Sequence, residues 1–132
     1  MRKLLLLLLI AVLAACGGEA PSSGELASQA AKTYYDQLLA GDYDGFLNGR
    51  AGTGGIPDSY REQLLASLRQ FMAQQQQAHQ GIESVAVSTS TAPGIDSTLN
   101  IMQVFLVLCF GDSTQEEIVV PMVEQDGEWK MK

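Results

Sequence analysis

Hydrophobic residues recur with a helical period in the first half of the chain. Residues 25–40 carry two neighbouring rows of apolar side chains, each spaced four residues apart, which make one broad stripe and predict a helix. Asp42 then stands where it can cap a short helix over residues 42–47. The sequence Ser59-Tyr60-Arg61-Glu62 fits a capping box, and the apolar face after it predicts a longer helix over residues 59–80.

The second half of the chain has the pattern of strands separated by short turns. Segments rich in Val, Ser and Thr or in apolar residues predict antiparallel strands at residues 82–91, 99–110, 116–124 and 128–132. Asp126-Gly127 is a strong signal for a two-residue hairpin, and Gly111-Asp112 also suits a tight turn. Helices followed by about four strands predict an α+β domain, in which the helices pack on a curled, cone-like antiparallel sheet.

The lengths of the turns decide which strand residues share a face of this sheet. With two-residue turns at both hairpins, Trp129 lies opposite Glu124 and Phe105 lies opposite Ile118. We expect the face with the large aromatic residues to meet the helices; it holds Ile101, Phe105, Val107, Cys109, Ile118, Val120, Met122, Trp129 and Met131. The second face then holds Met102, Val104, Leu106, Leu108, Val119 and Val123. A three-residue turn at either hairpin would exchange these assignments.

The second face is also apolar, although a sheet face in water usually alternates with polar residues. Two explanations are open. Strand ends or loops cover the face, or it is an interface, because contiguous exposed apolar area usually marks one. In the second case the partner is another copy of the chain or another protein of the cell envelope.

The first 24 residues differ from the rest. Two basic residues precede an apolar run shorter than the about 20 residues that a membrane-spanning helix needs. The sequence Leu13-Ala14-Ala15-Cys16 resembles the lipobox of bacterial lipoproteins. The resemblance implies that residues 1–15 are removed as a signal peptide and that Cys16 carries diacylglycerol and an acyl chain such as palmitate, enough for stable anchoring. Residues 16–24 then form a flexible tether and residues 25–132 the domain.

A lipidated cysteine would hold the domain at the surface of a membrane in the bacterial envelope. Gly17 stands where some inner-membrane lipoproteins carry aspartate, which favours the outer membrane in a Gram-negative cell. With Cys16 lipidated, Cys109 is left without a partner for an internal disulfide. Because Cys109 lies in an apolar run, we interpret it as a buried structural thiol.

Charge narrows the choice of partners. Removing residues 1–15 takes away two of the eight basic residues and none of the 15 acidic ones, so the formal charge changes from −7 to −9. Such a chain is a poor match for nucleic acid or for an anionic lipid surface.

Two segments resemble a known family. They are the run from Tyr34 to Tyr43, which ends in Gly-Asp-Tyr, and the terminal sequence Asp126-Gly127-Glu128-Trp129-Lys130-Met131. Over residues 25–132 the chain resembles the nuclear-transport-factor-two-like or cystatin-like superfamily, and within it small lipoproteins of an uncharacterised family once labelled lumazine-binding-like. The resemblance implies a cone fold and a tendency to dimerise or to bind small apolar ligands. It supplies no catalytic motif.

Dehydratases and isomerases of this fold place Asp, His or Tyr inside the cone to move protons. The single histidine, His79, lies among glutamines and is interpreted as a surface residue, and Asp42 and Asp44 are interpreted as helix caps. No cofactor is implied, and one histidine makes a weak metal-ligand set.

The sequence therefore favours a membrane-anchored, non-catalytic binding or interaction module. Its ligand-pocket candidates are Tyr34, Leu38, Phe71, Phe105 and Trp129. One alternative is a small enzyme of the dehydratase or isomerase type that uses the cone pocket. Another is an inhibitor-like partner protein, which an exposed acidic edge near Asp96 or Glu116-Glu117 would mark.

Overall fold

The computed structural model of the chain describes residues 22–88, 92–93 and 101–132. The leader, Cys16, Asp96 and the expected turn over residues 94–97 lie outside the described residues, so the predictions for them remain predictions. None of the described helices is long and apolar enough to cross a membrane.

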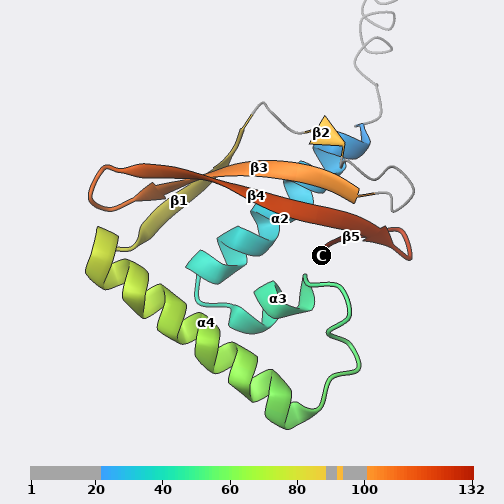
Figure 1. Ribbon diagram of the computed structural model, residues 1–132, viewed down its shortest axis with the longest axis horizontal. Helices are drawn as coiled ribbons and strands as arrows, with labels where there is room; N and C mark the ends of the chain where they lie inside the picture. Colours follow the sequence, from blue (N-terminus) through green and yellow to red (C-terminus); the bar gives the residue numbers. More distant parts are fainter. Residues whose placement is uncertain (1–21, 89–91, 94–100) are drawn as a thin grey trace, which may run out of the picture.

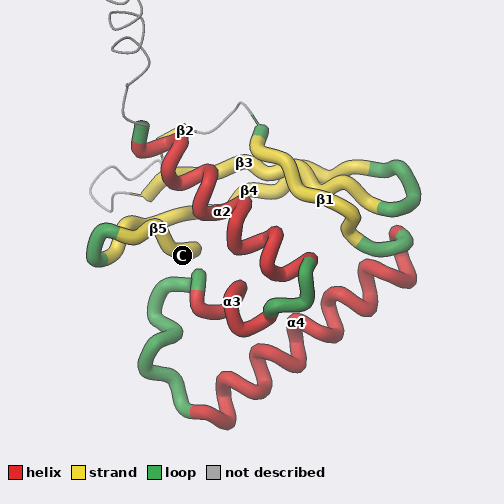
Figure 2. Tube along the Cα trace, turned by 180° about the vertical axis from the view of Figure 1, so that it is seen from behind, coloured by secondary structure: helices red, strands yellow, loops and turns green. Residues whose placement is uncertain are grey.

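The helices lie on one face of a curled antiparallel sheet (Figures 1 and 2). The helices are α2 (Ser23–Leu39), α3 (Tyr43–Asn48) and α4 (Asp58–His79). The strands are β1 (Ile82–Val87), β2 (Ala92–Pro93), β3 (Ile101–Phe110), β4 (Gln115–Gln125) and β5 (Glu128–Met131). Helix α2 packs against the sheet, whereas α4 runs along the outside of the helical layer and reaches the sheet at β1. The α+β class and the order of elements are as predicted.

Capping residues agree with the sequence at some helix ends. The Asp42 carboxylate accepts a hydrogen bond from the Gly45 N–H at 2.9 Å, which confirms the predicted cap of α3. Asp44, however, is not a cap and forms a salt bridge with Arg61 at 3.1 Å. The capping box at Ser59 was also a wrong prediction, because α4 begins one residue earlier, after Pro57, without a side-chain cap.

The sheet has the strand order β1-β3-β4-β5, and β2 pairs with β3. Strand β5 pairs only with residues 122–125 of β4. Residues 115–120 of β4 therefore have no strand on that side within the described part of the chain. We call this segment the free edge of β4.

The turn between β3 and β4 differs from the prediction. It contains three residues, 111–113, so that Leu106 rather than Phe105 lies opposite Ile118. Ser113 has a φ of 69° and donates its N–H to the carbonyl of Phe110 at 3.2 Å, as in a type I turn followed by a left-handed residue. The added residue reverses the facing of β3, because side chains alternate along a strand.

The expected second face is therefore wrong for β3. Val104, Leu106 and Leu108 point toward the helices and are buried in the core. Met102 shares their face and packs against the core. The face away from the helices, which we call the outer face, instead carries Phe105 and Val107, which are half-buried. Cys109 is also half-buried there. Val119 and Val123 pair with residues of this face, as predicted. Val119 lies on the free edge of β4, so it also borders the helix side of the sheet.

The turn between β4 and β5 has the predicted two residues. Asp126 and Gly127 have φ values of 52° and 81°, as a type I′ turn requires. Trp129 pairs with Glu124, and Met131 pairs with Met122. The helix-facing side of β4 and β5 is therefore as expected. The core that results contains Ala27, Ala31, Leu38, Phe46, Ile82, Val85, Val104, Leu106, Leu108, Phe110, Val120, Met122, Trp129 and Met131.

Candidate functional site

An apolar groove opens between α4, the end of α2 and the free edge of β4. Its volume is about 450 Å³, which is within the usual range of small-molecule sites. Helices α2, α3 and α4 and strands β3 and β4 contribute to its walls. The lining residues are Tyr35, Leu38, Phe46, Leu68, Phe71, Gln75, Leu108, Glu116, Ile118 and Val119.

The groove stays open because α4 packs loosely along its length. This helix has 22 residues, and Leu65 is its one buried residue. Phe71 faces the groove with 38% of its surface exposed, and Leu68 and Met72 are half-buried. Burial of an aromatic side chain by a ligand would be favourable by about 1.5–3 kcal/mol at most. The middle of α4 thus offers apolar surface that the chain itself does not cover.

The first turns of α4 are fastened to α3. The Arg61 guanidinium donates hydrogen bonds to Asp44 at 3.1 Å and to the side chain of Asn48 at 2.7 Å. These contacts fix one end of the groove wall.

The last turn of α4 is fastened to the β3–β4 hairpin. His79 Nδ1 lies 3.1 Å from an Asp112 carboxylate oxygen, and the His79 ring lies against the Phe110 ring at 4.5 Å between centroids. The Asp112 N–H also donates to the His79 carbonyl at 3.0 Å. Hydrogen bonds from Thr114, and secondarily the contact with His79, lower the pKa of Asp112. His79 is half-exposed, in agreement with its interpretation as a surface residue. Outside the groove, it also joins the end of α4 to the β3–β4 hairpin.

Tyr35 is the central polar residue of the groove. Its ring meets the Phe46 ring edge-on at 5.2 Å between centroids. Burial raises the pKa of Tyr35, and the positive charge of Arg50 opposes this shift. The hydroxyl is therefore a neutral donor at physiological pH. The groove's single carboxylate, Glu116, is exposed at its mouth.

A smaller hollow of about 220 Å³ adjoins the groove, because Tyr35, Phe46 and Val119 line both. Its other lining residues are Arg50, Val120, Pro121, Met131 and Lys132. We call it the basic hollow, since Arg50 and Lys132 are its charged residues.

The structure brings together only part of the predicted pocket. Leu38 and Phe71 line the groove. Tyr34 instead donates its hydroxyl to the carbonyl of Trp129 at 2.7 Å, and a Cβ at Gly49 would collide with its ring. Trp129 is a core residue, and Phe105 lies on the outer face because of the three-residue turn.

The predicted pocket residues do not include Tyr35, Phe46 or Arg50. Tyr35 belongs to the same predicted apolar stripe as Tyr34, but nothing in the periodicity shows which tyrosine turns toward α4. Arg50 is the single charged residue of the glycine-rich segment 48–56. A lone charged residue among glycines was the sequence signal that could have identified Arg50.

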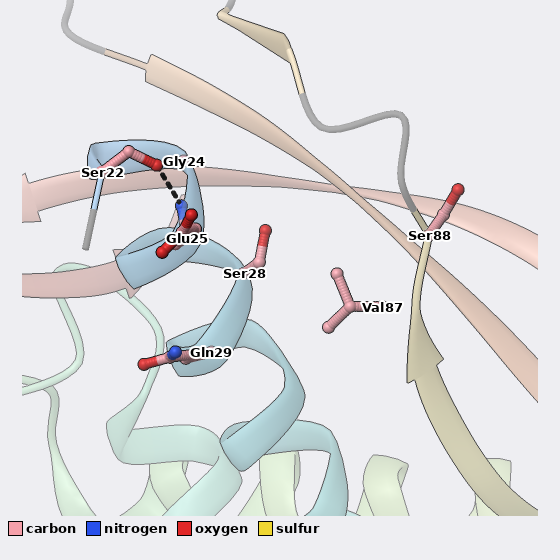
Figure 3. A pocket seen from close by; sticks show the side chains of 7 residues that line it. All are labelled: Ser22, Gly24, Glu25, Ser28, Gln29, Val87 and Ser88. Atoms are coloured by element: carbon pink, nitrogen blue, oxygen red, sulfur yellow. Dashed lines mark hydrogen bonds between the residues drawn. The ribbon is translucent and has the colours of Figure 1, made fainter. Parts of the chain in front are cut away.

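A second depression, of about 600 Å³, lies where α2 begins beside the end of β1 (Figure 3). Polar residues on its lining include Ser22, Glu25, Ser28 and Ser88. The Ser22 hydroxyl is occupied as the cap of α2, accepting from the Glu25 N–H at 3.2 Å. Ser28 and Ser88 also interact with other groups. The groove is therefore the stronger candidate site.

No cluster of His, Cys, Asp and Glu side chains suited to a metal ion occurs in residues 22–88 and 101–132. No family model and no curated protein matches the sequence. Among solved structures, the chain is similar to a crystal structure from Campylobacter jejuni described as an NTF2-like transpeptidase. The TM-score is 0.57 at 12% identity, over 76% of this chain and 92% of that one. The similarity, together with helices on a curled antiparallel sheet, shows that the chain has the NTF2-like cone fold.

Proposed function

We propose that this chain is a lipid-anchored, non-catalytic binding module and that the groove holds an apolar small molecule. The observation that carries the proposal is the groove itself, with Phe71, Leu68 and Ile118 only partly covered by the chain. Salt bridges and hydrogen bonds fasten α4 at both ends, so this surface belongs to a defined site.

The polar groups favour binding over proton transfer. A dehydratase or isomerase needs an acid and a base within hydrogen-bond reach of its substrate. In the groove, Glu116 lies in solvent at the mouth. Burial raises the pKa of Tyr35, so its phenol stays protonated at neutral pH and does not supply a base. His79 is held by Asp112 outside the groove.

The Campylobacter structure is described as a transpeptidase, which suggests a second kind of enzyme to compare with the groove. Transpeptidation by a covalent route needs an activated nucleophile with a base beside it. The thiol of Cys109, in the described part of the chain, is on the outer face of the sheet, whereas the groove is on the helix side. This arrangement favours the binding role for the groove.

The lipid anchor rests on the sequence from Leu13 to Cys16. In cells, the parent chain should sediment with membranes, and mass spectrometry of its first peptide should show an acylated Cys16. The variant Cys16→Ser should lose the acyl mass and leave the processed membrane form. An unmodified Cys16 in membrane-free protein would overturn this part of the proposal.

The groove is tested with an uncharged alkyl diazirine, photolysed in membranes that contain the full chain. Labelled peptides should come from α4 and β4. The variant Phe71→Glu should lower this labelling about tenfold, since it places a charge on apolar surface. Tyr60→Gln is the matched control, because Tyr60 is also an exposed aromatic residue of α4 but lies outside the groove. Equal loss in both variants, or labelling spread evenly over the domain, would contradict the proposal.

A further inference from the structure

We infer that the ligand of the groove is an amphiphile with a carboxylate head, bound in the basic hollow between Arg50 and Lys132. The inference rests on the proposed function of the groove and adds the chemical class of its ligand. It is carried by the distribution of positive charges and by the shared walls of the two spaces.

The cations of the described residues are nearly all occupied. Three form salt bridges, namely Lys32 with Asp36, Arg61 with Asp44 and Lys130 with Glu128. Arg69 lies over the Tyr43 ring, 5.9 Å from its centroid.

The two remaining cations, Arg50 and Lys132, form no salt bridge within the described part of the chain. Both line the basic hollow. In an acidic chain, unpaired cations would be expected to find carboxylates on neighbouring surfaces. No acidic side chain lines this hollow, so its two charged side chains, Arg50 and Lys132, are both positive and can attract an anionic group.

The basic hollow adjoins the apolar groove. Tyr35, Phe46 and Val119 line both the hollow and the groove. A ligand that spans them would place its apolar body against Phe71 and Leu68 and its head beside Arg50. The neutral Tyr35 hydroxyl, at the junction, can donate a hydrogen bond to that head. A guanidinium matches a carboxylate in a planar, bidentate geometry.

Charge along β4 sets the direction of binding. Glu116 lines the groove near one end of the strand, and Pro121 lines the basic hollow five residues further on. These positions are about 16 Å apart along a strand. A negative head is repelled by Glu116 and attracted by Arg50, so the ligand has one favourable orientation.

The test uses two diazirine probes with the same alkyl chain, one ending in a carboxylate and one in an alcohol, in membranes that hold the full chain at neutral pH. Labelling of each variant is divided by labelling of the parent for the same probe, which cancels unequal partitioning into lipid. The double variant Arg50→Gln with Lys132→Gln should reduce labelling by the carboxylate probe roughly three- to tenfold, as for partly screened charges. Labelling by the alcohol probe should not change.

Arg69→Gln is the matched control, since it removes a cation away from both spaces and should leave both probes unaffected. Lys132→Gln alone, at an exposed position, should give part of the effect without risk to folding. Equal behaviour of both probes in the double variant, with groove labelling intact, would overturn the carboxylate inference and leave the proposed function standing. Absence of saturable groove labelling by either probe in the parent would overturn the proposed function itself.

Discussion

The two hairpins of the sheet differ by one residue in their turns, and that residue decides which side of β3 is in the core. At Asp126-Gly127 the turn has two residues, and the strands pair as the sequence predicts. At residues 111–113 the turn has three, and every side chain of β3 moves to the opposite face from the predicted one. Because β3 is apolar on both sides, its own sequence does not determine which side is buried. The length of the turn that follows determines it.

The largest expected effect contrasts two neighbours on β3. Leu106 is fully buried, and Phe105 lies on the outer face. Leu106→Glu should destabilise the fold by on the order of 4 kcal/mol or more, because it buries an unpaired charge. Phe105→Glu should remain folded. Urea unfolding followed by circular dichroism measures both variants.

If Phe105→Glu were less stable than Leu106→Glu, the result would support a two-residue turn between β3 and β4 instead. Light scattering on Phe105→Glu adds a second result. A fall in mass relative to the parent would assign the outer face to contacts between copies of the chain.

The two-residue turn is tested at Gly127. Its φ of 81° is unfavourable for any residue with a Cβ, and no atom lies within 4 Å of where that Cβ would stand. Gly127→Ala should therefore cost about 1–2 kcal/mol through the backbone alone. Gly54→Ala, where the space is also open and φ is not positive, should change the midpoint of urea unfolding little. Equal effects would argue against the type I′ turn.

The three-residue turn is tested at Ser113, which has a φ of 69° without being glycine. Ser113→Gly should stabilise the chain by about 0.5–1 kcal/mol, since relief of the left-handed backbone is partly offset by a more flexible unfolded chain. The midpoint of urea unfolding should rise. A lower midpoint would mean that the Ser113 side chain, rather than the turn conformation, matters at this position.

The smallest expected effect concerns the contact between His79 of α4 and Asp112 of the same turn. Because hydrogen bonds from Thr114 lower the pKa of Asp112, its contribution to stability is present above the ordinary pKa of about 3.8 and is lost as the pH falls below it. Asp112→Asn should reduce the thermal midpoint at pH 7 and flatten its decline below pH 4. Parallel curves for parent and variant would show that the carboxylate is not linked to folding.

Prediction from sequence succeeded where a sequence pattern has a single structural explanation. Asp126-Gly127 suits a type I′ turn because both residues tolerate positive φ. At Gly111 the prediction of a two-residue turn was wrong, because glycine is required there for packing and not for the turn. A Cβ there would collide with the carbonyl of Gln80, so glycine is needed for the close approach of α4 and not for the turn. A local pattern cannot distinguish these two requirements.

The candidate site was less predictable than the fold. Leu38 and Phe71 could be placed beside a pocket from the apolar faces of their helices. Arg50 and Lys132 come together only because a short parallel bridge joins Arg50 to Met131, which sets the loop beside the last strand. Such contacts between distant segments leave no periodic pattern in the sequence.

The free edge of β4 bears on how the chain resists aggregation. An unpaired strand edge can template the addition of another chain. Here Glu116 and Glu117 place two exposed charges on the edge, and Pro121 beyond it has no N–H to donate. Two such edges meeting in antiparallel pairing would bring like charges together. Colloidal stability near neutral pH thus depends on the same acidic segment that repels a ligand's head group.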